Sequence, residues 1–271
     1  MLITKAEARA RQIHKLFFVN SVKSLVQLEL HDLVLARDCF YEETILKDCD
    51  GRFLFSNGEG IISINNLMRD KKKKRFVIAH ELGHFELHKN LKIASENQYK
   101  FFNWFKMGDH EKEANDFAAE LLMPTKLFRK FIKGKVVSPE LFKSISDEFQ
   151  VTMQNVLLNW VRASNQNAMV VCVVNNKVSW WKMSEPMADK DHPYIPRWVD
   201  YLPKITSKLP PPVNSAVGQM FKAKELDIIE NFEQIEKSTW FRTKPKEDRP
   251  MYEYAILVPN LKFALSLIWE D

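Results

Sequence analysis

The sequence predicts an α+β fold, on three observations. Apolar residues recur at helical spacing through most of the first 165 residues. Two short segments before residue 66 interrupt that spacing and are typical of strands, and the second, G-I-I-S-I-N, is rich in β-branched residues. After residue 165 the helical spacing gives way to short apolar runs that are bounded by turn residues. We therefore expect a core of helices and a small sheet in residues 1–135, a helical segment in 136–165, and a β-rich α+β domain in 166–271.

Helical spacing and turn residues place the individual elements. The expected helices cover residues 4–18, 20–37, 75–89, 109–123, 139–149 and 152–164. The expected strands cover residues 52–55, 60–65, 169–174, 177–183, 254–258 and 263–269. Ser56-Asn57-Gly58, Asn175-Asn176 and Pro259-Asn260 are turn sequences, so these strands should form three hairpins.

Composition places the chain among ordinary soluble proteins. The 271 residues are 45% hydrophobic and 28% charged, and no apolar run approaches the roughly 20 residues that cross a bilayer. The first residues lack the apolar centre of a secretory signal. We therefore expect a cytoplasmic protein without a membrane partner.

Cysteine and lysine content bounds the partners further. Cys39, Cys49 and Cys172 are odd in number and form no C-x-x-C pair, which argues against a disulfide scaffold and a cysteine metal site. The net charge of +5 is mild, and much of it comes from the run 71–75, which we expect to be a solvated loop. A nucleic-acid ligand is therefore not required.

The segment H-E-L-G-H, residues 80–84, carries the chemistry. His80 and His84 lie one turn apart on one helix face, so both imidazoles can reach one ion. Zinc accepts such ligands, and a catalytic site adds a third protein ligand and keeps one position for water. Glu81 is placed to take a proton from water that attacks a carbonyl. The segment predicts a zinc peptidase; Mn²⁺ and Fe²⁺ suit the same ligand types.

The third ligand is not fixed by spacing. His88 extends the histidine stripe, but it lies about 12 Å along the helix from His80, so one ion cannot bind both. On the helix 109–123, spacing favours Glu113 or Glu120 without choosing between them, while Glu111 flanks the other edge of the buried face. Asp116 lies further toward solvent.

Three segments together resemble the ImmA/IrrE family of zinc metallopeptidases. They are G-I-I-S-I-N, R-F-V-I-A-H-E-L-G-H-F-E-L-H and E-A-N-D-F-A-A-E-L-L-M-P, within about residues 50–125. The resemblance implies a zincin-like peptidase domain in residues 1–135 and selects Glu113, which precedes the Ala-Asn pair, as the third ligand. It also implies that the substrate is a helix-turn-helix repressor, whose cleavage would derepress mobile-element or stress-response genes.

Four further features of the sequence have candidate roles. The strand G-I-I-S-I-N is either an edge strand that takes up substrate or an internal strand. His110 and Tyr99 are candidate oxyanion donors. The segment 136–165 is helix-turn-helix-like, but its second helix has one arginine and no lysine, which favours a packing role over DNA binding. The aromatic domain 166–271 is a candidate sensory, GAF-like module, although aromatic strands are commonly core.

Two functions follow from these observations. The first is a zinc endopeptidase with Glu81 as general base and His80, His84 and Glu113 as metal ligands. The second is a non-proteolytic DNA-binding or toxin-antitoxin regulator with a structural metal site. Glu81 favours the enzyme, because a structural site needs no acid-base carboxylate.

Overall fold

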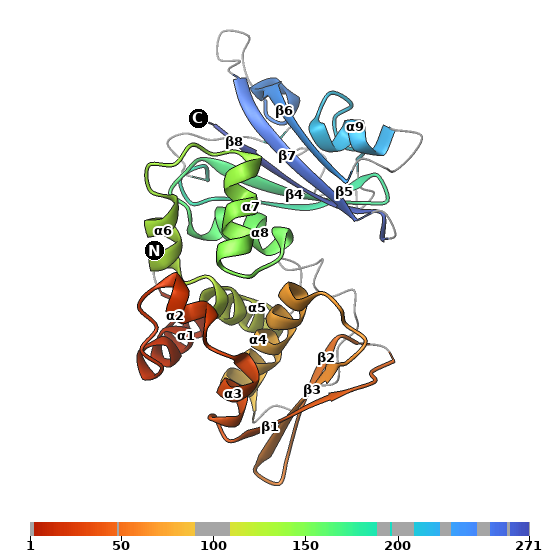
Figure 1. Ribbon diagram of the computed structural model, residues 1–271. Helices are drawn as coiled ribbons and strands as arrows, with labels where there is room; N and C mark the ends of the chain where they lie inside the picture. The colour runs from red at the N-terminus through yellow and green to blue at the C-terminus, as the bar shows by residue number, and fades with distance from the viewer. Residues whose placement is uncertain are drawn as a thin grey trace. The chain divides into compact units, whose positions relative to one another are not determined.

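The computed structural model describes residues 3–47, 49–89, 109–188, 196, 209–222, 229–242, 250–258 and 261–270. The chain divides into two compact units, each with its own sheet (Figure 1). The first consists of Met1–Lys135 and Lys143–Asn155, and the second of Val136–Phe142 and Val156–Asp271. The segment 136–165 is thus shared between the units. The α+β class is confirmed, and the three functional domains with boundaries at 135 and 165 stay a prediction.

The first unit opens with three helices, α1 (Lys5–Leu16), α2 (Val22–Val26) and α3 (Leu30–Leu35). A capping box of Thr4 and Glu7 starts α1. The single helix expected over residues 20–37 is wrong. Leu25 and Val34 are both buried, yet in one straight helix they would point in opposite directions, so the break between α2 and α3 lets both face the core.

A three-stranded sheet follows, made of β1 (Cys39–Thr44), β2 (Gly51–Ser56) and β3 (Glu59–Asn65). β2 and β3 form the expected antiparallel hairpin, and β1 pairs with β3 in parallel. The order β1-β3-β2 places β3 in the centre. The prediction that G-I-I-S-I-N is an edge strand is therefore wrong, and within the part of the chain that the structure describes β1 and β2 are the edges.

Three further helices of the first unit follow the sheet in the described sequence: α4 (Lys71–His88), α5 (Asp109–Leu122) and α6 (Thr125–Ile132). α4 begins four residues earlier than expected, because the Asp70 carboxylate caps it by accepting a hydrogen bond from the Lys73 N–H at 3.0 Å. The lysine run is therefore helical, and the expectation of a solvated loop is wrong.

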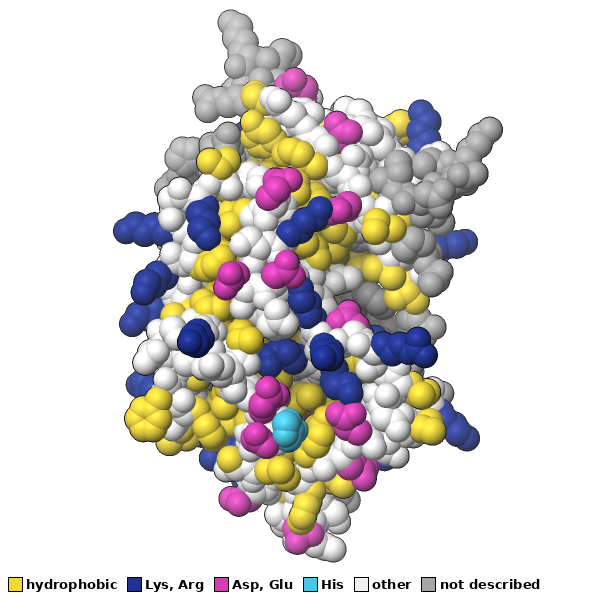
Figure 2. Space-filling view, viewed as in Figure 1, with side chains coloured by type: hydrophobic (Ala, Val, Ile, Leu, Met, Phe, Trp, Pro, Cys, Tyr) yellow, Lys and Arg dark blue, Asp and Glu magenta, His cyan; other side chains and the backbone are white. Residues whose placement is uncertain are grey.

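Three lysines of this run form ion pairs with carboxylates. Lys72 pairs with Asp147 at 2.6 Å, Lys73 with Asp50 at 2.8 Å, and Lys74 with Glu43 at 2.8 Å. Figure 2 likewise shows Lys and Arg side chains interrupted by Asp and Glu on the face drawn. The run is thus largely neutralised within the protein.

The helices α7 (Pro139–Glu148) and α8 (Met153–Ala163) agree with the helix-turn-helix-like prediction in type and length. Both helices bury large side chains, among them Phe142, Leu157 and Trp160. The Phe142 ring contacts Trp160 edge-on, with ring centroids 5.1 Å apart. The buried side chains of α7 and α8 therefore serve hydrophobic packing.

The second unit is built on a five-stranded antiparallel sheet in the order β5-β4-β8-β7-β6. Its elements are β4 (Ala168–Val174), β5 (Lys177–Met183), α9 (Ala216–Lys222), β6 (Glu230–Glu236), the 3₁₀ turn η3 (Lys237–Thr239), β7 (Pro250–Val258) and β8 (Phe263–Trp269). Asn175 and Asn176 both have positive φ, as the tight β4–β5 turn requires. β7 and β8 pair as expected; their turn at Pro259-Asn260 lies outside the described residues.

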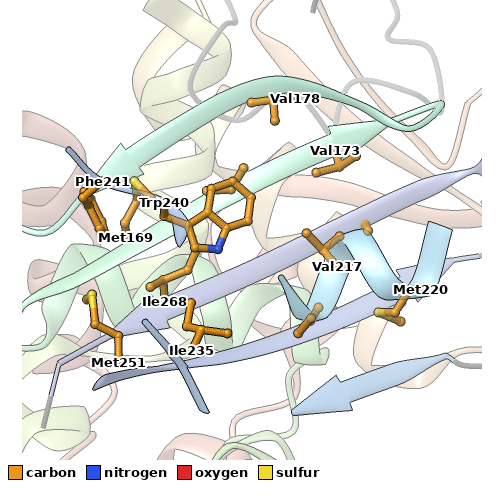
Figure 3. Close-up of a cluster of buried hydrophobic side chains, with 14 of the residues drawn as sticks. Met169, Val173, Val178, Val217, Met220, Ile235, Trp240, Phe241, Met251 and Ile268 are labelled. Carbon is orange, nitrogen blue, oxygen red and sulfur yellow. The ribbon is translucent and has the colours of Figure 1, made fainter. Parts of the chain in front are cut away.

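Aromatic and apolar side chains fill the core of this unit. Trp240 lies among Met169, Met251 and Ile268 (Figure 3), and its indole N–H donates a hydrogen bond to the Glu253 carboxylate at 2.8 Å. Glu253 is fully buried and also accepts from the Ser266 hydroxyl and the Val217 N–H. The tryptophans serve the core, and the sensory role of this domain stays a prediction.

No helix in the described part of the chain combines the length and the apolarity needed to cross a membrane. Cys39, Cys49 and Cys172 are all buried thiols. Burial raises the pKa of Cys39 to about 12, so this thiol stays protonated and takes a packing role.

Candidate metal centre

Helix α4 holds the H-E-L-G-H segment inside the first unit. Its residues from Phe76 to Phe85 are all buried, between the sheet on one side and α5 on the other. His80, Glu81 and His84 are each at most 3% exposed. Polar groups at such depth are stable only with partners, so their surroundings define the site.

Helix α5 packs very closely against α4 at Gly83. A Cβ atom at position 83 would lie 3.0 Å from Phe117 and 3.1 Å from the Cα and carbonyl oxygen of Ala114. Only glycine permits this approach without displacing the α5 backbone. The glycine of the segment therefore brings the first turn of α5 within reach of the histidines.

Three side chains direct potential ligand atoms toward one point between the two helices. The Nε2 atoms of His80 and His84 lie 3.1 Å apart, and they lie 3.4 Å and 3.6 Å from the two carboxylate oxygens of Glu111. A tetrahedral ion with bonds of 2.0–2.1 Å spaces its ligands about 3.3 Å apart. These side chains therefore fit a zinc-sized ion, with one tetrahedral position left for water.

Hydrogen bonds orient both rings from behind. The Asn115 side-chain oxygen lies 2.9 Å from His80 Nδ1, and Asn115 is buried one turn after Glu111 on the same face of α5. Behind His84, the His88 Nδ1 lies 3.2 Å from His84 Nδ1, and His88 Nε2 lies 2.8 Å from a Glu113 oxygen. Both Nε2 atoms are thereby directed at the common point.

The structure thus places Glu111, rather than Glu113, beside His80 and His84. Glu113 belongs to a second group with His88 and His110. Glu120, the other candidate, is buried elsewhere and accepts from Arg11 Nε at 2.8 Å and from Thr125. The i, i+4 pair of Glu111 and Asn115 is the sequence signal for this face of α5; the ligand role of Glu113 stays a prediction that this geometry does not favour.

Glu81 lies against the first residue of β2. A Cβ atom on Gly51 would come within 2.9 Å of Glu81 Oε1 and 2.5 Å of Val77 Cγ1. The absence of a side chain at Gly51 makes room for the carboxylate. Of the two sheet edges, β2 is therefore the one whose strand adjoins the expected general base.

Of the two candidate oxyanion donors, the structure describes His110 but not Tyr99. The His110 ring lies beside that of His88, with ring centroids 4.8 Å apart. Tyr99 falls outside the described residues. The role of either residue stays a prediction.

Comparison with known proteins finds a family match for part of the chain. Residues 42–160 match the family model of peptidase family M78, described as the IrrE N-terminal-like domain. A solved structure described as a Mycobacterium tuberculosis transcriptional regulator superposes with a TM-score of 0.60, over 98% of this chain and 88% of that chain. Its sequence is 13% identical, so it supports the fold alone. No curated protein matches the chain.

Proposed function

We propose that the chain is a metal-dependent endopeptidase. The premise is that it carries an IrrE N-terminal-like domain of the ImmA/IrrE family, whose chemistry is of the metallopeptidase type. The observation that carries the proposal is the convergence of His80, His84 and Glu111 within 3.1–3.6 Å, with Glu81 buried on the next position of the same helix. A purely structural site has no use for that carboxylate.

The proposed ligands are His80 and His84 with Glu111, in place of the sequence-based choice of Glu113. Zinc is the proposed ion, and when bound it polarises the scissile carbonyl and lowers the pKa of water toward neutrality. Glu81 accepts a proton from the attacking water and returns it to the amine that leaves when the peptide bond breaks. Asn115 holds His80 in the ligating orientation.

The proposed substrate is a helix-turn-helix transcriptional repressor, which the family relationship supports. Its cleavage would derepress the genes it controls. A segment of substrate in extended form would pair with the edge of β2 that carries no partner strand among the described residues and that adjoins Glu81. The ion-paired lysines of α4 and the apolar packing of α8 support a protein rather than a nucleic acid as direct ligand.

The test uses the full-length protein, a Glu81→Gln variant and a repressor encoded beside the gene. We expect about one zinc per chain in both proteins, since glutamine keeps the size of the side chain and Glu81 is no ligand. Loss of the general base should slow cleavage by about 10² to 10⁴-fold, followed by mass spectrometry of the fragments.

Cleavage at equal rates by both proteins would refute the role of Glu81. A wild-type protein that binds zinc, leaves every neighbouring repressor intact and binds operator DNA would favour the non-proteolytic regulator.

A further inference from the structure

A chain of hydrogen-bonded side chains runs from the metal centre to the protein surface. His84 directs Nε2 toward the ligand cluster and Nδ1 toward His88 Nδ1, 3.2 Å away. The other nitrogen of His88 lies 2.8 Å from Glu113 Oε2. The His88 side chain is 2% exposed and that of Glu113 is 40% exposed, so the chain begins in the core and ends at solvent.

The proton positions in this chain follow from the metal site. An imidazole that offers Nε2 to a cation carries its proton on Nδ1. His84 Nδ1–H is then a donor, so His88 Nδ1 must accept. A neutral His88 that accepts at Nδ1 carries its proton on Nε2 and donates it to the Glu113 carboxylate. Each of the two contacts then has one donor and one acceptor.

We propose that His88 and Glu113 are positioning residues of the metal centre, acting through His84. The carboxylate fixes the tautomer of His88, and His88 fixes the tautomer and the ring orientation of His84. This inference rests on the proposed metal site. His80 receives its orientation from the neutral amide of Asn115, so the two ligating histidines differ in the charge behind them. The carboxylate behind His84 makes that ring the more basic of the two ligands.

An alternative interpretation is that His88 and Glu113, together with His110, form a second cation site. His88, His110 and Glu113 bring ligand atoms within 4.8 Å of one another. A cation on His88 Nε2 would force the His88 proton onto Nδ1. Two N–H donors, on His84 and His88, would then face each other at 3.2 Å. Occupation of the first site therefore opposes occupation of the second, and the hydrogen-bonded chain is the favoured state.

The first test is the tautomer of His88 in the zinc-loaded, full-length protein. Spectra of ¹⁵N-histidine-labelled protein distinguish Nδ1–H from Nε2–H rings, and a His88→Gln variant assigns the resonance. We expect Nδ1–H for His84, Nε2–H for His88 and one zinc per chain. Protonation of His88 on Nδ1, or two zinc ions per chain, would overturn the proposal.

The second test is zinc affinity by chelator competition, with no substrate present. Glu113→Ala should weaken zinc binding about 10 to 100-fold, the usual effect of losing such an outer partner. Glu113→Gln should recover part of the affinity, because its amide oxygen still accepts from His88. Asp109→Asn is the matched control, since it removes an exposed carboxylate from the same helix, and it should bind zinc as the wild type does.

The outcomes separate this inference from the proposed function. Wild-type affinity in Glu113→Ala, or equal loss in Asp109→Asn, would overturn the positioning role while leaving the metal site intact. A wild-type protein that binds no zinc would overturn the site and this inference together.

Discussion

A side chain added at Gly51 should damage catalysis without removing the metal. An alanine Cβ there would lie 2.9 Å from Glu81 Oε1 and 2.5 Å from Val77 Cγ1, whereas ordinary contact begins at 3.4 Å. The carboxylate must therefore recede by about 0.5 Å and the valine methyl by about 0.9 Å. Such overpacking costs about 1–3 kcal/mol of unfolding free energy.

The rate should fall more steeply than stability. A displacement of about 1 Å at a catalytic group costs up to 10²-fold, so we expect Gly51→Ala to lose about 10-fold or more in kcat/KM. Zinc per chain should be unchanged, because the three atoms nearest to the added Cβ belong to Val77 and Glu81, neither of which is a proposed ligand. The assay combines repressor cleavage, metal content and urea unfolding.

Gly58→Ala is the matched control in the same hairpin. A Cβ there meets nothing within 4 Å, but its φ of +86° makes alanine costly by about 1–2 kcal/mol. We expect destabilisation with normal kcat/KM. Normal turnover in Gly51→Ala, or an equal loss in both variants, would refute the reasoning that Gly51 makes room for the base.

Three further predictions concern ligand choice, helix packing and pH. Glu111→Gln should reduce zinc per chain after dialysis far more than Glu113→Gln, and the reverse order would restore Glu113 as the ligand. Gly83→Ala, which presses on the Ala114 backbone, should lower both zinc affinity and unfolding free energy, the latter by about 1–3 kcal/mol in urea. Burial raises the pKa of Glu253, so the native state binds more protons than the unfolded state above the ordinary glutamate range. Unfolding free energy should therefore fall as pH rises from about 4.5 toward the folded pKa, by at most about 1.4 kcal/mol per unit, and Glu253→Gln should lack this slope.

Local patterns predicted most of the elements but few of their partners. The β2–β3 hairpin and helix α5 follow from turn residues and periodicity within a few positions. The parallel pairing of β1 with β3 joins residues about 20 positions apart, and no local signal specifies it. That pairing alone converts β3 from an edge strand into a central one.

The candidate metal site was predictable on α4 and ambiguous on α5. His80 and His84 need only the helical repeat to share a face. Glu111 and Glu113 are two positions apart and both contact α4, Glu111 at His80 and His84 and Glu113 at His88, so the choice depends on how α5 is rotated and aligned against α4. That orientation is set by the contact of Gly83 with Ala114, a tertiary feature.

The two functions of the site are carried by separate pieces of the fold. Two helices supply the three proposed ligands and their hydrogen-bond partners, while the β2–β3 hairpin meets Glu81, the proposed general base, at Gly51. Under the proposed function, changes in the hairpin sequence should alter which substrates are accepted without disturbing the proposed metal ligands. Position 51 is the exception within the hairpin, because a residue larger than glycine there would press directly on Glu81.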